Sequence, residues 1–385
     1  MKNKKPLGIY VHIPFCKSKC HYCDFCSSPA NDKTKSEYVK ALIDDISSET
    51  ARNYFSDHVV DTIYLGGGTP TCLAPDVLDS IINAILSVYS VSNEAEITAE
   101  CNPGTVNYDD LSSLRQSGFN RLSLGLQSTH DNELNSLGRI HNFKDFDSTF
   151  DNARKAGFNN ISVDLMYGIP QQTLLSFEQT LRTLINYSPE HISAYSLKIE
   201  PGTNFFKNKE NLMLPDEDCE YNMYESAVNI LGSAGYSHYE ISNYAKVGYI
   251  SKHNFKYWNC DDYAGFGVSA HSCIGTNRYS TTPFIEKYLN SYERPSKSYV
   301  SLEESLSLSE FAEEYIMMRM RLSFGISMGE FANRFGFNFK EKYFSRLLPF
   351  IKSGHIICND DSIYFSNKGM YISNYILSSI LDLNQ

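Results

Sequence analysis

The sequence predicts an α/β protein with a parallel sheet, followed by a smaller helical unit at the carboxyl end. β-rich segments alternate with helical segments in six successive repeats between residues 8 and 197, which is the order expected of parallel strands joined by crossover helices. After residue 300 the pattern changes to helices and a hairpin. In addition, polar or glycine-rich segments follow the predicted strands, and parallel α/β barrels carry their active sites at those strand ends.

The repeats are expected to consist of short strands and amphipathic helices. Strands are predicted at 8–13, 59–65, 95–101, 120–127, 160–167 and 191–197. The helices between them are predicted at 34–55, 75–90, 108–117, 145–156 and 172–186. No internal sequence repeat accompanies this alternation, so the pattern is not that of a solenoid.

The chain is expected to divide into three regions. Residues 1–205 form the main α/β domain, 206–300 form a connecting region, and 301–385 form a C-terminal winged-helix-like cap. Within the connecting region, 206–235 are charged and helical, and Leu214-Pro-Asp-Glu-Asp is a plausible helix start.

The cap is predicted from two helices over 303–335 and a hairpin over 353–365 that turns at Asn359-Asp-Asp. Because the chain is acidic, this unit is interpreted as a structural appendage rather than as a DNA-binding module.

Composition and charge exclude several classes of function. The 385-residue chain has a formal net charge of −11, which argues against general affinity for nucleic-acid phosphate or an anionic membrane. No apolar run approaches the length of an integral membrane segment, and there is no signal-peptide pattern. The ten cysteines do not suggest a disulfide framework in a chain of this length, and their use fits a reducing, cytoplasmic location.

Three cysteines near the amino end are the most informative residues. Cys16, Cys20 and Cys23 follow the first predicted strand with the spacing C-x3-C-x2-C. Three thiolates on one tight loop can hold three irons of a [4Fe–4S] cube and leave the fourth iron without a protein ligand. The alternative is a zinc site, because Cys26 follows closely and four cysteines can close a tetrahedral site.

Polar groups also stand at the ends of later strands. The run Gly66-Gly67-Gly68-Thr69-Pro70 lets the backbone approach a ligand closely, although a glycine run usually marks only a turn. Glu100 could accept both hydroxyls of a ribose, or be a solvated charge. Gln127 and Arg139 carry groups that bind carboxylates or amides. Asp164 lies inside an apolar strand, where a carboxylate needs a partner, and this favours a functional role.

In their order and spacing, these segments resemble the radical S-adenosylmethionine (SAM) family, and within it the oxygen-independent coproporphyrinogen III oxidase group. The match covers roughly residues 8–205 and extends through Tyr195-Ser-Leu-Lys-Ile-Glu-Pro-Gly-Thr and Tyr239-Glu-Ile-Ser-Asn-Tyr-Ala. The resemblance implies a partial (β/α)6 barrel and a cluster whose open iron binds SAM. In that family, an electron from the cluster splits SAM into methionine and a 5′-deoxyadenosyl radical.

The resemblance also implies which residues hold the cofactors. The cysteine triplet is the metal site, and Tyr10, Gly67 and Glu100 match positions that contact the cluster-bound SAM. Other residues match positions that line the rest of the cofactor pocket, including a second SAM in the oxidase branch: Tyr22, Gly68, Thr69, Gln127, Arg139 and Asp164. The two tyrosines flank the cysteine loop and could equally be packing residues.

Two branches of this family share the barrel, and two features argue against the oxidase branch. That branch carries a long arm before its cysteine motif, whereas fifteen residues precede Cys16 here. It also has a fourth cysteine two residues after the third, whereas Phe25 stands there and Cys26 is displaced by one. A shift of one residue on a short loop changes the direction of the side chain, so Cys26 is not a clean match.

A six-residue motif favours the other branch, the haem chaperones called HemW. That branch carries H-N-x-x-Y-W, and this chain has His253-Asn254-Phe255-Lys256-Tyr257-Trp258. Imidazole is a common axial ligand of haem iron, and aromatic rings can stack on the macrocycle. Haem binding is therefore expected at His253, Tyr257 and Trp258, with His271 as a weaker second candidate, although a lone histidine is more often an ordinary polar residue.

The sequence is interpreted as that of a haem chaperone that binds the cluster, SAM and haem and delivers haem to acceptor haemoproteins. An electron donor for the cluster is a further expected partner. The alternative is an oxygen-independent coproporphyrinogen III oxidase, a radical SAM enzyme of porphyrin biosynthesis that oxidatively decarboxylates propionates. A zinc protein with a winged-helix interaction module is a third and more distant hypothesis.

Overall fold

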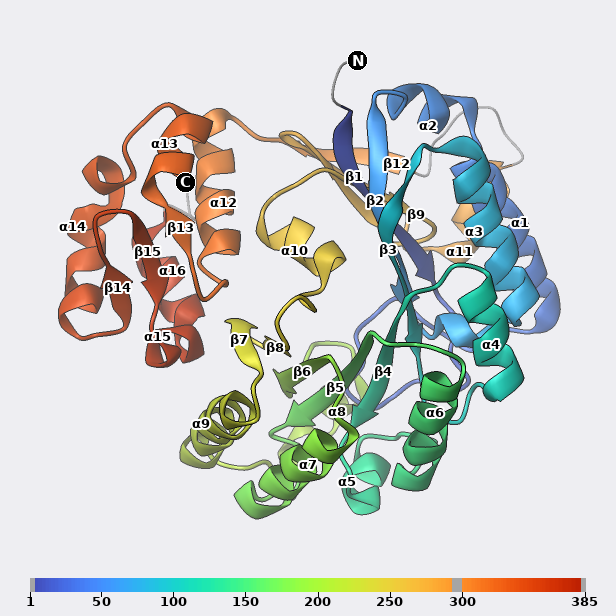
Figure 1. Ribbon diagram of the computed structural model, residues 1–385, viewed down its shortest axis with the longest axis horizontal. Helices are drawn as coiled ribbons and strands as arrows, with labels where there is room; N and C mark the ends of the chain where they lie inside the picture. Colours follow the sequence, from blue (N-terminus) through green and yellow to red (C-terminus); the bar gives the residue numbers. More distant parts are fainter. Residues whose placement is uncertain (1–3, 293–299, 382–385) are drawn as a thin grey trace.

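Six parallel strands form the centre of the structure, which is a computed structural model describing residues 4–292 and 300–381 (Figure 1). They are β1 (Lys5–Ile13), β2 (His58–Gly67), β3 (Val91–Cys101), β4 (Arg121–Gln127), β5 (Ile161–Tyr167) and β6 (His191–Ser196). Each strand pairs in parallel with the next, as crossover connections require. The predicted strands are confirmed, with small differences at their ends.

Both edges of this central sheet are extended by segments that follow it in the chain. The added strands are β7 (Ser237–Glu240), β8 (Asn243–Ala245), β9 (Tyr263–Phe266), β10 (His271–Ile274), β11 (Asn277–Thr281) and β12 (Val300–Ser305). The strand order is β12-β11-β10-β9-β1-β2-β3-β4-β5-β6-β8-β7. Because β12 and β7 do not pair with each other among the described residues, the sheet is an open partial barrel, and the predicted fold class is confirmed.

The strands between 236 and 300 were missed by the sequence prediction. They are only three to five residues long, too short for an alternating pattern to stand out. Residues 1–3, 293–299 and 382–385, which belong to the three predicted regions, lie outside the described residues.

Helices cover the outer face of the sheet (Figure 1). They are α1 (Asp32–Ile46), α2 (Glu49–Tyr54), α3 (Pro75–Val88), α4 (Tyr108–Gln116), α5 (Asp131–Ser136), α6 (Phe143–Lys155) and α7 (Leu174–Tyr187). The prediction of one helix over 34–55 is wrong, because the Ser48 side chain accepts a hydrogen bond from the Ala51 amide and starts a second helix. The short helix α5 was not predicted.

Alternation along β1 shows how one strand serves both faces of the sheet. Leu7, Ile9, Val11 and Ile13 have no exposed surface and belong to the main hydrophobic core beneath the helices. The intervening Tyr10 points to the opposite, inner face, where its ring lies near those of Tyr64 and His253. The core therefore anchors the sheet from outside, and the inner face is left for polar and aromatic groups.

Shorter elements complete the connecting region. They are η1 (Pro70–Cys72) after β2, then α8 (Asn204–Lys207), η2 (Lys209–Asn211), α9 (Glu217–Ser233), α10 (Lys252–Trp258) and α11 (Ile285–Tyr292). Asp216 accepts a hydrogen bond from the Cys219 amide, and this confirms the helix start predicted from Leu214-Pro-Asp-Glu-Asp. None of the helices in the described ranges has the length and hydropathy that a membrane span requires.

The carboxyl end forms a separate group of helices around a small sheet (Figure 1). Its elements are α12 (Leu308–Arg319), β13 (Ile326–Ser327), α13 (Met328–Phe335), α14 (Phe339–Lys352), β14 (Ile356–Cys358), β15 (Ser362–Phe365), α15 (Asn367–Tyr371) and α16 (Ser373–Ile380). β14 and β15 form the predicted antiparallel hairpin, and the Asn359 side chain accepts from the Asp361 and Ser362 amides in its turn.

Candidate functional site

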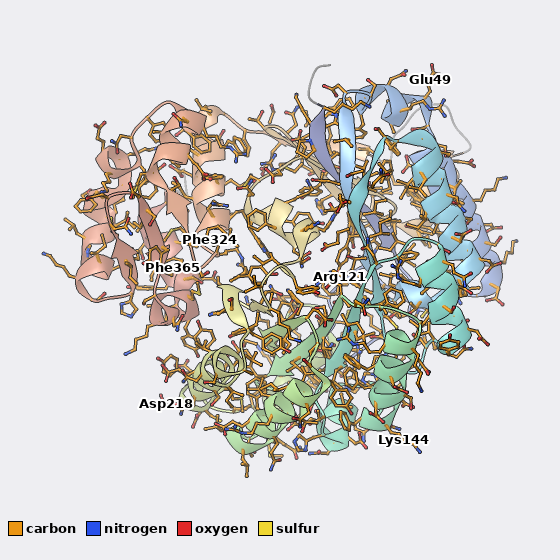
Figure 2. The ribbon with its side chains drawn as sticks, in the orientation of Figure 1. Glu49, Arg121, Lys144, Asp218, Phe324 and Phe365 are labelled. Atoms are coloured by element: carbon orange, nitrogen blue, oxygen red, sulfur yellow. The ribbon has the colours of Figure 1, made fainter. Side chains whose placement is uncertain are left out.

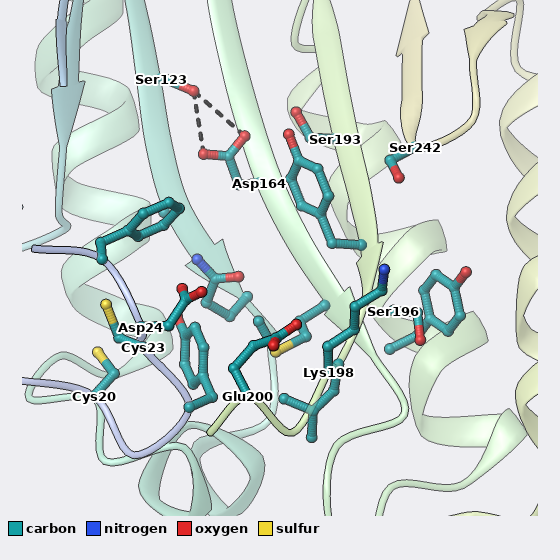
Figure 3. A pocket seen from close by; sticks show the side chains of 18 of the residues that line it. Cys20, Cys23, Asp24, Ser123, Asp164, Ser193, Ser196, Lys198, Glu200 and Ser242 are labelled. Carbon is teal, nitrogen blue, oxygen red and sulfur yellow. Dashed lines mark hydrogen bonds between the residues drawn. The ribbon is translucent and has the colours of Figure 1, made fainter. Parts of the chain in front are cut away.

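A cavity of about 1130 Å3 lies against the inner face of the sheet, and the cysteine loop forms one end of it. Cys16, Cys20 and Cys23 line this cavity, and Figure 3 shows Cys20 and Cys23 on the loop at its edge. The loop is fixed by hydrogen bonds from the Cys16 amide to the Ser28 carbonyl, 3.3 Å, and from the Cys23 amide to the Cys20 carbonyl, 3.2 Å. The three predicted cluster ligands therefore share one site.

Most of the residues predicted to bind SAM line the same cavity. They are Tyr22, Gly67, Gly68, Thr69, Glu100, Gln127, Arg139 and Asp164. Tyr10 is not among the described residues that line the cavity. Its hydroxyl instead lies 3.0 Å from Nδ1 of His12.

Cys26 lies outside the cavity, as its displaced position in the sequence suggested. Its thiol faces the Pro283 carbonyl at 3.5 Å. In the described part of the chain, no three His, Cys, Asp or Glu side chains converge closely enough to hold a single metal ion. Each thiolate of a cubane site binds a different iron, so its sulfurs need not converge, whereas a tetrahedral zinc site requires that they do. The donor set fits a three-cysteine cubane.

The glycine turn after β2 packs directly against the start of the cysteine loop. The Gly68 amide donates to the Ile13 carbonyl and the Thr69 amide to the Phe15 carbonyl, both at 2.8 Å. A Cβ on Gly68 would lie 2.6 Å from the Phe15 carbonyl oxygen, and Gly67 has a φ of +108°, which only glycine adopts readily. The Thr69 hydroxyl lies 3.6 Å from the Cys16 sulfur. These glycines allow two backbone segments to meet at the cavity.

Glu100 lies at the end of β3 with its carboxylate fixed by two donors. The Tyr64 hydroxyl donates to one oxygen at 2.9 Å, and the Gly67 amide donates to the other at 3.1 Å. Burial outweighs these hydrogen bonds and raises the pKa of Glu100 to about 7. The carboxyl group is thus held in place and changes its charge near neutral pH.

Arg139 places a positive charge beside the cysteine loop. Its guanidinium donates to the Cys20 sulfur at 3.4 Å, and also to Asn102 and to the Gly125 carbonyl at 2.6 and 2.5 Å. Tyr22 is packed into the same group, where burial raises its pKa above the ordinary value. The hydrogen bond from the guanidinium fixes the position of the Cys20 sulfur at the edge of the cavity.

Gln127 ends β4 in a strained conformation. Its φ of 71° lies in the left-handed region, and the pairing of β4 with β5 shifts register between Gly125 and Gln127. The resulting bulge re-aims the side chain, and such bulges are frequent beside active sites.

Asp164 projects into the cavity from the middle of β5. The Ser123 hydroxyl lies within hydrogen-bonding distance of both carboxylate oxygens, at 3.3 and 3.1 Å (Figure 3). Burial nevertheless raises the pKa of Asp164. The expectation that this carboxylate has a partner is confirmed.

Several cavity residues were missed by the sequence analysis. The structure adds Tyr64, Asn102, Arg121, Ser123, Ser193, Tyr195, Lys198, Glu200, Asn254 and Arg321. Every second residue of β4 lines the cavity: Arg121, Ser123, Gly125 and Gln127. Because alternate residues of a strand share one face, the position of Gln127 could have predicted the other three.

Helix α10, which carries the H-N-x-x-Y-W motif, lies behind this cavity with its histidine enclosed. His253 has no exposed surface. Its Nδ1 is 2.8 Å from the Thr62 hydroxyl, and its Nε2 is 2.8 Å from the Tyr257 hydroxyl. Burial lowers the pKa of His253 to about 3, so the ring is neutral at pH 7. In this conformation both nitrogens are engaged, and iron ligation by His253 would require α10 to move.

The other predicted haem residues are held in different ways. The Tyr257 ring meets that of Tyr263 edge-on, and the guanidinium of Arg321 lies 4.7 Å from the Trp258 ring centroid. The Trp258 indole nitrogen is buried and has no hydrogen-bond partner in the part of the chain that the structure describes. His271 is exposed on β10, whereas His253 is fully buried. Asn254 is the residue of the motif that lines the cavity.

Comparison with known proteins relates the chain and its fold to a family. The model of the Radical SAM superfamily matches residues 10–184, and that of the HemN C-terminal domain matches residues 306–372. The structure of coproporphyrinogen III oxidase (HemN) from Escherichia coli superimposes with a TM-score of 0.86, covering 98% of this chain and 90% of that chain at 22% identity. This likeness concerns the fold.

Sequence relatives narrow the assignment. Proteins described as heme chaperone HemW are 35% identical in Bacillus subtilis, covering 97% of this chain and 98% of the relative, and 31% identical in Lactococcus lactis, covering 99% of each. The protein of the same description from Escherichia coli is 38% identical over 70% of each chain. The chain belongs to the HemW family of the radical SAM superfamily.

Proposed function

We propose that this protein is a haem chaperone, which binds a [4Fe–4S] cluster and SAM at the cysteine end of its cavity, binds haem, and transfers haem to acceptor haemoproteins. The observation that carries the proposal is the joint lining of one cavity by Cys16, Cys20 and Cys23 and by the motif residue Asn254 of α10. The names of the HemW relatives point to the same activity.

The residues around the cysteine loop suit a cluster with bound SAM. Three thiols face the cavity while Cys26 faces Pro283, which leaves one corner of a cubane for SAM. Glu100 offers carboxylate oxygens to a ribose, Gly67 and Gly68 leave room for close approach, and Arg139 donates a hydrogen bond to the Cys20 sulfur. When bound, the cluster and SAM supply one-electron chemistry.

Haem binding through α10 requires a change in the helix. The neutral ring of His253 is the form that can ligate iron, but the Tyr257 hydroxyl lies 2.8 Å from its Nε2. We propose that haem binding opens this contact, so that Tyr257 and Trp258 follow the helix toward the macrocycle.

Anaerobic reconstitution with iron and sulfide, followed by haem titration with and without SAM, tests the proposal. We expect a Soret band that saturates with added haem, followed by transfer of haem to an apo-haemoprotein such as apomyoglobin. His253→Ala should weaken haem binding sharply, while His271→Ala is the exposed control. Failure to take up haem, together with conversion of coproporphyrinogen III to protoporphyrinogen in the presence of SAM and a reductant, would replace the chaperone by the oxidase.

A further inference from the structure

Arg121, the first residue of β4, is a buried arginine whose Nε has no hydrogen-bond partner among the described residues. It is 2% exposed and lines the cavity. Its Nε has no hydrogen-bond partner, and within the described ranges no carboxylate lies within 4.0 Å of its guanidinium. Figure 2 labels Arg121 near the centre of the molecule. Arginine stays charged in proteins, so a positive charge faces the cavity unpaired.

The acids nearest to this guanidinium are committed to other donors. Glu100 accepts from Tyr64 and Gly67, and Asp164 accepts from Ser123. Both carboxyl groups interact electrostatically with Arg121 without forming an ion pair with it. Because a buried guanidinium is costly unless its donors are hydrogen-bonded, this arrangement is typical of a residue whose direct partner arrives with a ligand.

The position of Arg121 separates it from the cysteine loop. Arg121 and Gln127 face the cavity from opposite ends of β4, and six residues of strand span roughly 20 Å. Gln127 lies at the carboxyl end of the strand, where the cysteine loop also lies. Arg121 lies at the other end, and it adds to the effects of burial and of Lys256 that lower the pKa of His253 on α10. The neighbouring Arg321 is already paired with Glu240, at 2.7 Å.

We propose that Arg121 binds a carboxylate of the ligand at the end of the cavity nearest α10. The planar guanidinium offers paired donors that match a carboxylate, and Asn254 is a neutral group at the same end. Two ligands could supply the carboxylate: a propionate of a tetrapyrrole, or the amino-acid end of a SAM molecule. The tetrapyrrole source rests on the proposed function, and the distance from the cysteine loop favours it.

Two pairs of probes distinguish these sources. The first pair is haem and haem dimethyl ester, which lacks free carboxylates; the second is SAM and decarboxylated SAM. Each is titrated against the anaerobically reconstituted full chain and against Arg121→Met, which keeps the length of the side chain and removes its charge. Arg182→Met is the matched control, because Arg182 is exposed on α7, where it pairs with Glu178 at 3.8 Å.

If a propionate binds Arg121, Arg121→Met weakens haem binding by tenfold or more and leaves the affinity for the dimethyl ester unchanged. If the amino-acid end of SAM binds there, the same loss is seen for SAM and not for its decarboxylated analogue. The thermal midpoint of Arg121→Met should not fall, because no protein partner is lost. Arg121→Lys should recover part of the affinity, and it decides the question if Arg121→Met does not fold.

Equal affinities of the parent and Arg121→Met for all four probes overturn the proposal. If the parent takes up no haem, the haem-chaperone function fails and the SAM pair alone decides the role of Arg121. If haem binds the parent and both variants equally, and SAM does likewise, the chaperone function stands and the carboxylate site is rejected.

Discussion

The cysteine loop and helix α10 carry the two sequence motifs of this protein, and the structure treats them in opposite ways. The thiols of Cys16, Cys20 and Cys23 line the cavity at its edge. His253 of α10 is fully buried, with both ring nitrogens hydrogen-bonded to hydroxyls of the protein. One motif is therefore open to a ligand as it stands, and the other must rearrange before it can bind one.

A sequence motif therefore identifies candidate ligands without showing whether their side chains are exposed to the cavity. Spacing on a short loop after a strand is enough to bring three thiols to one site. A histidine on a short helix has two directions available, and packing against Thr62, Tyr64 and Tyr257 decides between them.

Removing one cluster thiol should abolish the metal site. Cys20→Ser is expected to lose iron and sulfide after anaerobic reconstitution, because three thiolates are the minimum that the proposed cubane site offers. Cys26→Ser is the matched control and should retain both, since Cys26 faces Pro283 outside the cavity. Iron and sulfide analysis with visible absorption measures the effect. Equal iron content in Cys20→Ser and the parent would contradict it.

Replacing the enclosed histidine should destabilise the protein. His253→Ala removes two buried hydrogen bonds and leaves a void, which is expected to lower the free energy of unfolding by about 3 kcal/mol. His271→Ala, at an exposed position, should change it by less than about 0.5 kcal/mol. Urea unfolding of the two variants measures the contrast, and equal stabilities would show that the His253 contacts are absent in solution.

His253 should contribute to the pH dependence of the free energy of unfolding. Its pKa falls from the ordinary 6.5 to about 3 on folding, so the unfolded chain binds the extra proton between these values. This contribution to stability is complete above pH 6.5 and is lost as the pH falls toward 3. As the pH falls from 6.5 to 3, the free energy of unfolding should therefore decrease less for His253→Gln than for the parent. Urea unfolding at a series of pH values measures this, and equal decreases in the two proteins would contradict the lowered pKa of His253.

Glu100 should make SAM binding depend on pH near neutrality. Because its pKa is raised to about 7, the carboxylate that accepts the ribose hydroxyls forms as the pH rises through 7. SAM affinity of the parent should increase roughly tenfold over this range, and Glu100→Gln should flatten the dependence. Calorimetric titration at several pH values measures it. A flat profile for the parent would remove Glu100 from the SAM site.

In the absence of SAM, the ionisation of Glu100 should also lower the free energy of unfolding. A carboxyl with a raised pKa stabilises the fold below its ordinary value of 4.5, and this contribution is lost as the pH rises through about 7. The free energy of unfolding of Glu100→Gln should therefore fall less between pH 4.5 and 7 than that of the parent.

Gln127 gives the smallest expected effect and separates strain from binding. Gln127→Gly relieves a left-handed φ of 71° and should raise the free energy of unfolding by about 1 kcal/mol. The same variant should weaken SAM binding, because the amide side chain that faces the cavity is lost. Urea unfolding and SAM titration on one preparation measure both changes, and a loss of stability would argue against a strained backbone.

Much of the fold and part of the site follow from the sequence. The strands β1 to β6 were predictable because long apolar segments alternate with capped helices. The cavity residues from Cys16 to Asp164 were predictable because they lie in those strands or in the segments that follow them. The short strands β7 to β11 were not predictable, since three to five residues are too few for an alternating pattern to stand out. Arg121 was missed because a charge at the start of a strand resembles a solvated end until the sheet curves around it.

The most direct test of the account is the electron paramagnetic resonance spectrum of the reduced, reconstituted protein before and after addition of SAM. A three-cysteine cluster with an open iron predicts about four irons and four sulfides per chain and a spectrum that changes when SAM binds. Zinc without sulfide, or an iron–sulfur signal that SAM leaves unchanged, would contradict the account.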